Sequence, residues 1–232
     1  MGRKRKSVWR WRIAALLLLA AIVAGTYGWW RAIGWQPPRA EYPMQGALVG
    51  ADDGAVDFNA LRATGADFVY LEASHGAEGR DPQFPRNLAA ATDAPLPHGA
   101  VHAYDPCVPA QRQAANFVTI VPRDPQLLPP AIALDKLASE CADPIVEAGL
   151  ESELTTFINQ VEGHAGQPVV LKISPAFEAE HAIAARVERN LWLERDFLQP
   201  DYAGRPWTLW TATSYLRGEA SDGPLRWVVV QP

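Results

Sequence analysis

Apolar and polar positions form two different patterns between residues 46 and 230 of the chain, short apolar runs and longer stretches with helical spacing. Short runs rich in β-branched and aromatic residues, bounded by glycine, proline and polar residues, are typical of buried strands. Eight such runs predict strands at 46–51, 67–73, 98–104, 129–135, 168–174, 190–196, 207–213 and 225–230.

Longer stretches with apolar residues three and four positions apart separate most of these runs and predict helices. The predicted helices are 56–65, 84–94, 109–122, 144–166 and 175–187. Eight strands joined mostly by helical crossovers predict an α/β fold, an irregular TIM-like β/α barrel whose closure departs from the regular pattern near the end of the chain.

The start of the chain has another pattern. Residues 1–12 carry six basic side chains, and residues 13–30 contain no charged one. A helix of that length spans roughly 27 Å, enough for a bilayer core. We therefore expect a basic cytoplasmic tail (1–12), a transmembrane anchor (13–30), a Pro-rich linker (31–44) and a domain (45–232) outside an inner or plasma membrane. The alternative is a signal peptide cleaved near Gly25.

Charge and cysteine content limit which classes of binding partner and cofactor we expect. Residues 1–35 hold seven of the 21 basic residues and none of the 26 acidic ones, so the rest of the chain is strongly acidic and should not bind nucleic acid. Cys107 and Cys141 each follow a predicted strand, and an oxidising compartment favours a disulfide between them. The sequence has no H-E-x-x-H, G-x-S-x-G or phosphate-binding motif, and we expect neither a metal nor a cofactor.

Five motifs occur in order along the predicted barrel: QGALVGADDGAVDFNAL, DFVYLEASHGAEGRDPQFPRN, HGAVHAYDP with QRQAANF, LPPAIALD, and WTLWTAT. They resemble G-I-D-V-S-x-x-Q-G-x-I-D-W, F-x-x-x-K-A-T-E-G with D-x-x-F-x-x-N, G-x-Y-H-F with Q-A-x-x-F, L-P-P-A-V-D-L-E, and W-x-L-W-Q-Y of glycoside hydrolase family 25, the muramidase-type lysozymes. The resemblance covers about residues 45–230 and implies a barrel that uses carboxyl groups at its strand ends to cleave peptidoglycan glycan.

The carboxyl positions of that family are mostly replaced in this chain. The family places an aspartate on the first strand, Asp-x-Glu on the fourth and an aspartate on the last. At the matching positions this sequence has Leu48, then Ala133 and Asp135, then Arg226. Three of the four acids are absent and the fourth is one methylene shorter, so we expect muramidase activity to be weak or absent.

Asp135 and Glu72 are the candidate catalytic carboxyls. Asp135 occupies the general-acid position, and its alternative role is to cap the next turn or to pair with Lys136, Lys172 or Arg226. Glu72 replaces the lysine of K-A-T-E-G. It either forms a rearranged acid pair with Asp135 from a neighbouring strand end, or it is a solvated acid or a partner of Arg80.

Four further residues are candidates for a glycan-binding groove: His75, His102, Trp192 and Trp210. Aromatic rings can stack on sugar faces, and Trp207 and Trp227 are two further tryptophans of the last predicted strands. His75 replaces the glutamate of K-A-T-E-G. Each also has a structural interpretation. The rings would fill the barrel, His102 would be a hydrogen-bonded core histidine, and His75 would be an exposed loop residue.

Three functions follow. The first is a membrane-anchored, catalytically degenerate lysozyme-like protein that binds peptidoglycan glycan or an envelope protein at the cell wall. The second is an active muramidase with a rearranged acid pair, Asp135 and Glu72. The third is a structural envelope protein that keeps only the fold.

Overall fold

The computed structural model describes residues 3–143 and 147–232, and the chain forms two compact units, residues 1–35 and 36–232. The first unit is one helix, α1 (Arg3–Ile33). Over Trp9–Ile33 this helix is long and apolar enough to cross a membrane, as an anchor or a signal sequence would. The helix contains the whole predicted span 13–30 and extends into the predicted linker.

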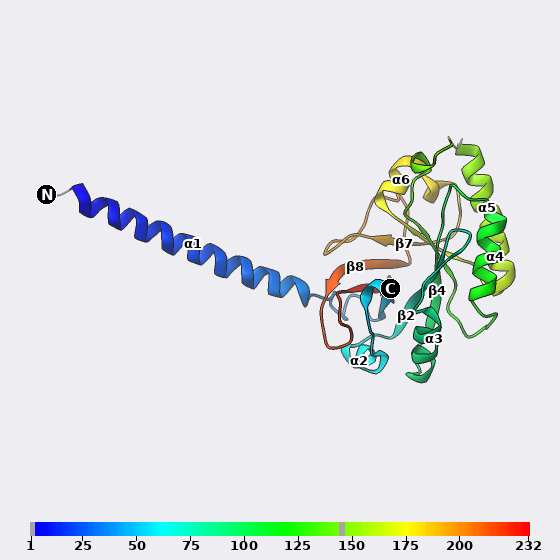
Figure 1. Cartoon of the computed structure of the whole chain (residues 1–232), viewed down its shortest axis with the longest axis horizontal. Coiled ribbons are helices and arrows are strands. Elements are labelled where there is room, and N and C mark those ends of the chain that lie inside the picture. Colours follow the sequence, from blue (N-terminus) through cyan, green and yellow to red (C-terminus); the bar gives the residue numbers. More distant parts are fainter. Residues whose placement is uncertain (1–2, 144–146) are drawn as a thin grey trace. The chain divides into compact units, whose positions relative to one another are not determined.

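The second unit is a closed barrel (Figure 1). Its strands are β1 (Gln45–Val49), β2 (Phe68–His75), β3 (Gly79–Arg80), β4 (His98–Ala103), β5 (Ala131–Leu134), β6 (Val170–Ile173), β7 (Asn190–Glu194), β8 (Leu209–Leu216) and β9 (Leu225–Val230). They are hydrogen-bonded in the order β1-β9-β8-β7-β6-β5-β4-β2-β3, and β1 also pairs with β2. Eight strands therefore close on themselves, which confirms the predicted barrel, and β3 is a short antiparallel addition to β2.

The irregularity of the barrel lies at its end. Strands β1, β2 and β4 to β8 run parallel to their neighbours in the series, whereas β9 is antiparallel to both β8 and β1. Only eight residues, 217–224, connect β8 to β9. A link of that length closes a hairpin but is too short for a parallel crossover.

The helices of the second unit are α2 (Phe58–Thr64), α3 (Phe84–Asp93), α4 (Ala110–Ile120), α5 (Glu147–Ala165) and α6 (Pro175–His181). Residues 144–146, the start of the predicted helix 144–166, lie outside the described residues. The predicted helix 175–187 is wrong in its second half, because Ala182 adopts a left-handed conformation (φ 48°) that ends α6, and a short 3-10 turn follows. No α-helix occupies the connection from β7 to β8, which is residues 195–208.

The barrel interior is filled by alternate residues of the strands, as the two-residue period of a strand requires. This cluster consists of Leu48, Phe68, Tyr70, Val101, Ala131, Ala133, Val170, Trp192, Leu209 and Val228. Outward-facing strand residues pack against the apolar faces of the helices, for example Phe117 and Phe157, which are 1 % and 0 % exposed. The filled interior leaves the strand ends as the place for a site.

Candidate functional site

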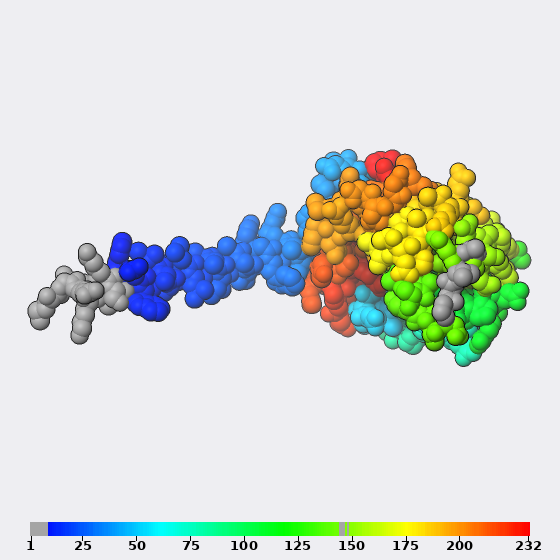
Figure 2. Space-filling view, turned by 90° about the horizontal axis from the view of Figure 1, so that it is seen from above, coloured from blue at the N-terminus to red at the C-terminus, as the bar shows by residue number. Residues whose placement is uncertain are grey.

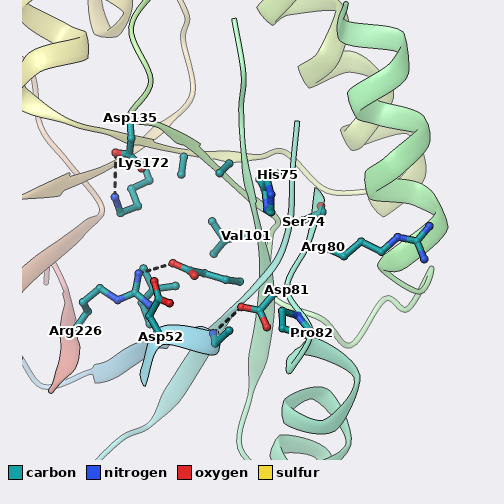
Figure 3. Close-up of a pocket in the computed structure, with 15 residues that line it drawn as sticks. Asp52, Ser74, His75, Arg80, Asp81, Pro82, Val101, Asp135, Lys172 and Arg226 are labelled. Atoms are coloured by element: carbon teal, nitrogen blue, oxygen red, sulfur yellow. Dashed lines mark hydrogen bonds and ion pairs between the residues drawn. The ribbon is translucent and has the colours of Figure 1, made fainter. Parts of the chain in front are cut away.

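A cavity of about 400 Å³ lies at the carboxyl ends of the parallel strands. We call it the central cavity, and Figure 3 shows its lining. The lining residues are Leu48, Ala51, Asp52, Glu72, Ser74, His75, Arg80, Asp81, Pro82, Val101, Ala103, Ala133, Asp135, Lys172 and Arg226. All five residues expected at the family's carboxyl and lysine positions are among them, because strand order and register bring these positions to one edge.

One side of the central cavity is built around Lys172, the third residue of β6. Its Nζ lies 3.4 Å from Asp135 Oδ1 and 2.7 Å from Glu194 Oε2. The three residues come from the ends of β5, β6 and β7, which are neighbours in the barrel. Burial lowers the pKa of Lys172, but the two carboxylates outweigh burial and raise the pKa above its ordinary value. The ammonium is therefore charged, and it faces the carboxyl groups of Asp135 and Glu194.

The opposite side of the central cavity is built around Arg226 on β9. Its Nη2 donates to Asp53 Oδ2 at 2.9 Å, and its Nη1 donates to Glu72. Burial lowers the pKa of Arg226, and the carboxylates of Glu72 and Asp53 raise it by more. Arg226 is also the register partner of Leu48 on β1. Two positions that would carry acids in the resembled motifs thus lie side by side, occupied by an arginine and a leucine.

The loop after β1 holds the second carboxylate of this side in place. Asp53 is 5 % exposed and accepts a hydrogen bond from the Gly50 amide at 2.6 Å. Any side chain on Gly50 would collide with the Glu72 carboxylate, so glycine lets that carboxylate approach the backbone. Asp81 joins the same loop to the start of α3, because it accepts from the amides of Ala51 and Gln83, both at 2.7 Å.

The two candidate catalytic carboxyls both line the central cavity, but their strands are not neighbours. Glu72 lies on β2 and Asp135 follows β5, with β4 between them. This corrects the expectation of adjacent strand ends. Each carboxylate has a separate cationic partner, Arg226 for Glu72 and Lys172 for Asp135 (Figure 3). Arg80, the expected partner of Glu72, instead extends away from the other lining side chains (Figure 3).

The two histidines have different surroundings. His75 is exposed and lines the central cavity. His102 does not line it, because its side chain points outward from β4 to the rings of Phe117 and Phe157. The amide of Gln113 donates to two carbonyls, so Gln113 Oε1 accepts from His102 Nε2, and Ser74 Oγ donates to His102 Nδ1 at 2.8 Å. Burial lowers the pKa of His102 to about 4, so His102 is a neutral core histidine and not a groove residue.

The two tryptophans proposed for a groove do not line the central cavity either. Trp192 is fully buried in the barrel interior and donates from Nε1 to Thr211 Oγ1 at 2.8 Å. Trp210 faces outward from β8, is 3 % exposed and donates to the Arg195 carbonyl. Their burial favours the structural interpretation, that these rings fill space in and around the barrel.

The rim of the central cavity is tied by a disulfide. Cys107, after β4, is bonded to Cys141, after β5, with their Cα atoms 5.3 Å apart. This confirms the predicted pairing. Lys136 Nζ contacts Asp105 Oδ2 at 2.8 Å and links the same two loops. Asp105 lies near both sulfur atoms, but bonded sulfurs are not thiolates and do not offer a metal site.

Glu194, Asp53 and Asp81 contribute to the site, but the motif comparison assigned no role to them, although Asp81 matches the aspartate of D-x-x-F-x-x-N. Asp53 follows a predicted strand, Asp81 precedes a predicted helix, and Glu194 lies near the end of a predicted strand. Position at the carboxyl end of a parallel strand is the signal that could have found Glu194. Asp53 stands where the first motif has glutamine, and its contact with β9 depends on a pairing 173 residues away in sequence.

A closed α/β barrel with charged side chains gathered at the carboxyl ends of its strands has the architecture of the β/α-barrel enzymes, which place their sites at that end. The family model for glycosyl hydrolases family 25 matches residues 49–218. The chain therefore belongs to this family. Leu48 and Arg226, two of the replaced carboxyl positions, lie just outside the matched range.

Solved structures share the fold. A family 25 glycosyl hydrolase from Bacillus anthracis has a TM-score of 0.75 at 24 % identity, covering 86 % of this chain and 93 % of that one. A lysozyme from Streptomyces coelicolor has a TM-score of 0.70 at 18 % identity, covering 82 % and 92 %. The Escherichia coli protein called "Uncharacterized protein YegX" is 22 % identical over 159 residues, which are 68 % of this chain and 57 % of that protein.

Proposed function

We propose that this chain is a cell-wall protein of the glycoside hydrolase type whose central cavity binds peptidoglycan glycan, or an envelope protein, without cleaving glycan, and that α1 anchors it in the membrane. One observation carries the proposal. Among the described lining residues, the carboxyl at the general-acid position, Asp135, is ion-paired to Lys172, whose other partner is Glu194.

The ion pair of Asp135 matters because glycoside cleavage requires specific roles of two carboxyl groups. One carboxyl must deliver a proton to the leaving oxygen, and a second must act as base or nucleophile. A carboxylate in contact with a charged lysine can accept a hydrogen bond but has no proton to give. Glu72, the rearranged partner in the alternative hypothesis, is likewise held by Arg226, so neither candidate is free for acid catalysis.

The Glu72–Arg226 pair supports retention of the cavity for binding. In the resembled motifs these two positions carry a lysine and an aspartate. Here both charges are reversed, and the two side chains contact each other although β1 lies between β2 and β9. A reversed but complementary pair keeps the cavity folded and charged, because a single reversal would leave like charges buried together.

Two assays on the full chain test the proposal. In a zymogram on purified peptidoglycan we expect no clearing, and in sedimentation with insoluble sacculi we expect the chain to be retained. Strong cleavage that disappears in Asp135→Asn would overturn the degenerate-site proposal. If Glu72→Gln abolished it as well, the muramidase with a rearranged acid pair would take its place. Failure to bind sacculi would favour a protein partner or a structural role.

A gain-of-function variant tests whether the replaced carboxyl positions explain the expected absence of glycan cleavage. The set Leu48→Asp, Ala133→Asp, Asp135→Glu and Arg226→Asp rebuilds the family carboxyls, and Glu72→Lys must accompany it because Arg226→Asp alone would face two acids. We expect measurable cleavage from this variant once its folding is verified. The matched control is the same set without Asp135→Glu, which should cleave less.

A further inference from the structure

A second cavity, of about 380 Å³, lies at the other end of the barrel. We call it the aromatic cavity, and it is lined by Glu41, Tyr42, Gln199, Trp207, Gln231 and Pro232. Tyr42 precedes β1, Trp207 precedes β8, and Gln231 follows the antiparallel β9. These three points share the amino edge of the parallel strands, opposite to the central cavity. Figure 2 shows the light-blue, orange and red segments together on the surface.

Three aromatic rings form a fixed group in this cavity. The Trp207 ring is stacked on Tyr42 with centroids 6.4 Å apart and a 23° angle, and it meets Trp210 edge-on at 5.9 Å. Tyr42 and Trp210 are 5 % and 3 % exposed, whereas Trp207 is partly exposed. The two buried rings therefore hold Trp207 in one orientation with part of its surface open, at the connection 195–208 that no helix covers.

Polar groups with unused hydrogen-bonding capacity surround this ring. Within the described part of the chain, the side chains of Glu41 and Gln231 and the indole N–H of Trp207 have no hydrogen-bond partner in the protein, while Gln199 donates to the Tyr42 hydroxyl. An indole N–H, a primary amide and a carboxylate supply both donors and acceptors. None of the lining residues is basic, and Glu41 disfavours an anionic ligand.

We propose that the aromatic cavity binds a neutral pyranose unit of a polysaccharide. One face of a pyranose ring presents C–H groups. The partial positive charge of their hydrogens complements the negative face of an indole ring. Its hydroxyl groups need both donors and acceptors, which the amide, the carboxylate and the indole provide. The volume is within the range of small-molecule sites lined by aromatic residues with a few polar groups. This site is separate from the central cavity and is independent of glycan cleavage.

The test is a titration of the full chain in a detergent without a sugar head group, because a maltoside or glucoside would compete. The probes are the trisaccharides of N-acetylglucosamine and of glucose, followed by calorimetry and saturation-transfer NMR. We expect binding of at least one, weakened at least tenfold by Trp207→Ala and about threefold by Gln231→Ala. The matched control is Tyr215→Ala, an exposed aromatic on β8 outside the cavity, which should bind as wild type does.

The outcomes separate this inference from the proposed function. Absence of binding to both trisaccharides, or binding unchanged by Trp207→Ala, overturns the inference. If Trp207→Ala does not fold, Gln231→Ala and Trp207→Phe decide, since both should bind measurably more weakly than wild type. If the chain does not bind sacculi but binds a trisaccharide through Trp207, the proposed function is refuted and the sugar site is not. Retention on sacculi that is unchanged by Trp207→Ala, with no trisaccharide binding, refutes the sugar site alone.

Discussion

At the scale of single residues, the central cavity is organised by two cations that each contact two carboxylates. Lys172 has a side chain that is 8 % exposed, while those of Asp135 and Glu194 are 48 % and 31 % exposed. The lysine therefore depends on its partners more than they depend on it, because an enclosed charge without a partner is costly.

This asymmetry predicts unequal effects of removing the two partners. Glu194→Gln removes the closer contact of Lys172 and should lower the free energy of unfolding by about 2 kcal/mol, whereas Asp135→Asn, which removes a longer contact of a half-exposed group, should cost less than about 1 kcal/mol. Urea denaturation of both variants measures the difference. Equal losses, or a larger loss in Asp135→Asn, would contradict the assignment of Glu194 as the main partner.

His102 makes stability depend on pH. Its pKa is lowered to about 4 in the folded chain and is about 6.5 when unfolded. Between these values the unfolded state binds more protons, so stability falls as the pH decreases from about 6.5 to about 4, by about 3 kcal/mol in total. Urea unfolding between pH 7 and pH 4 should show this loss. His75→Gln removes only the last of the influences on the His102 pKa and should keep most of the loss, whereas His102→Gln should remove the pH dependence.

At the scale of elements, the disulfide connects the loops that follow β4 and β5 and therefore borders the position of Asp135. A covalent link between residues 34 apart in sequence restricts the unfolded chain and stabilises the folded one by about 3–4 kcal/mol in the chain-entropy model. The loops also share the Lys136–Asp105 contact, so they should remain near each other without the bond, though less rigidly.

The double variant Cys107→Ser, Cys141→Ser should therefore fold but unfold with about 3 kcal/mol less free energy. Reduced wild-type chain is the matched control and should show the same loss. Mass analysis without reduction supplies an independent measurement, since two free thiols in the untreated chain would reject the pairing. The proposed sugar site lies at the other edge of the barrel, so trisaccharide binding should be the same in both forms.

At the scale of the whole molecule, the chain combines an apolar helix and an acidic barrel. The helix places Trp9 and Trp11 near one end of the apolar segment and Trp29 and Trp30 at the other, as in the aromatic belts of membrane-spanning helices. The basic residues of 1–12 then favour a cytoplasmic amino terminus, which would leave the barrel on the cell-wall side.

Membrane fractionation tests this arrangement. The full chain should sediment with membranes, resist extraction by high salt or carbonate, and enter solution with detergent, because burial of an apolar helix does not depend on charge. A chain lacking residues 1–35 is the control and should be soluble. Recovery of a natural soluble form that begins near residues 25–36 would instead identify a cleaved signal peptide.

The sequence by itself determined the elements of this protein and their order. Strand and helix periods are local, so eight strands, the apolar amino-terminal helix and the barrel class followed from runs such as 168–174 and 190–196. The sequence also showed that only one of the family's four carboxyl positions, Asp135, still carries an acid. The end of the helix predicted over 175–187 was wrong, because hydrophobic periodicity does not show the left-handed alanine that ends α6 at His181.

Only the tertiary structure decided which charges meet and which rings are open. Lys172 contacts Glu194 because β6 and β7 pair in parallel register, and Arg226 contacts Asp53 because barrel closure places β9 beside β1, far away in sequence. Trp192 is enclosed because it points into the barrel, whereas Trp207 is partly exposed in the connection 195–208, which contains no α-helix. Neither these ion pairs nor the exposure of these rings can be predicted from the local sequence, because burial and pairing are properties of the closed barrel and not of any local segment.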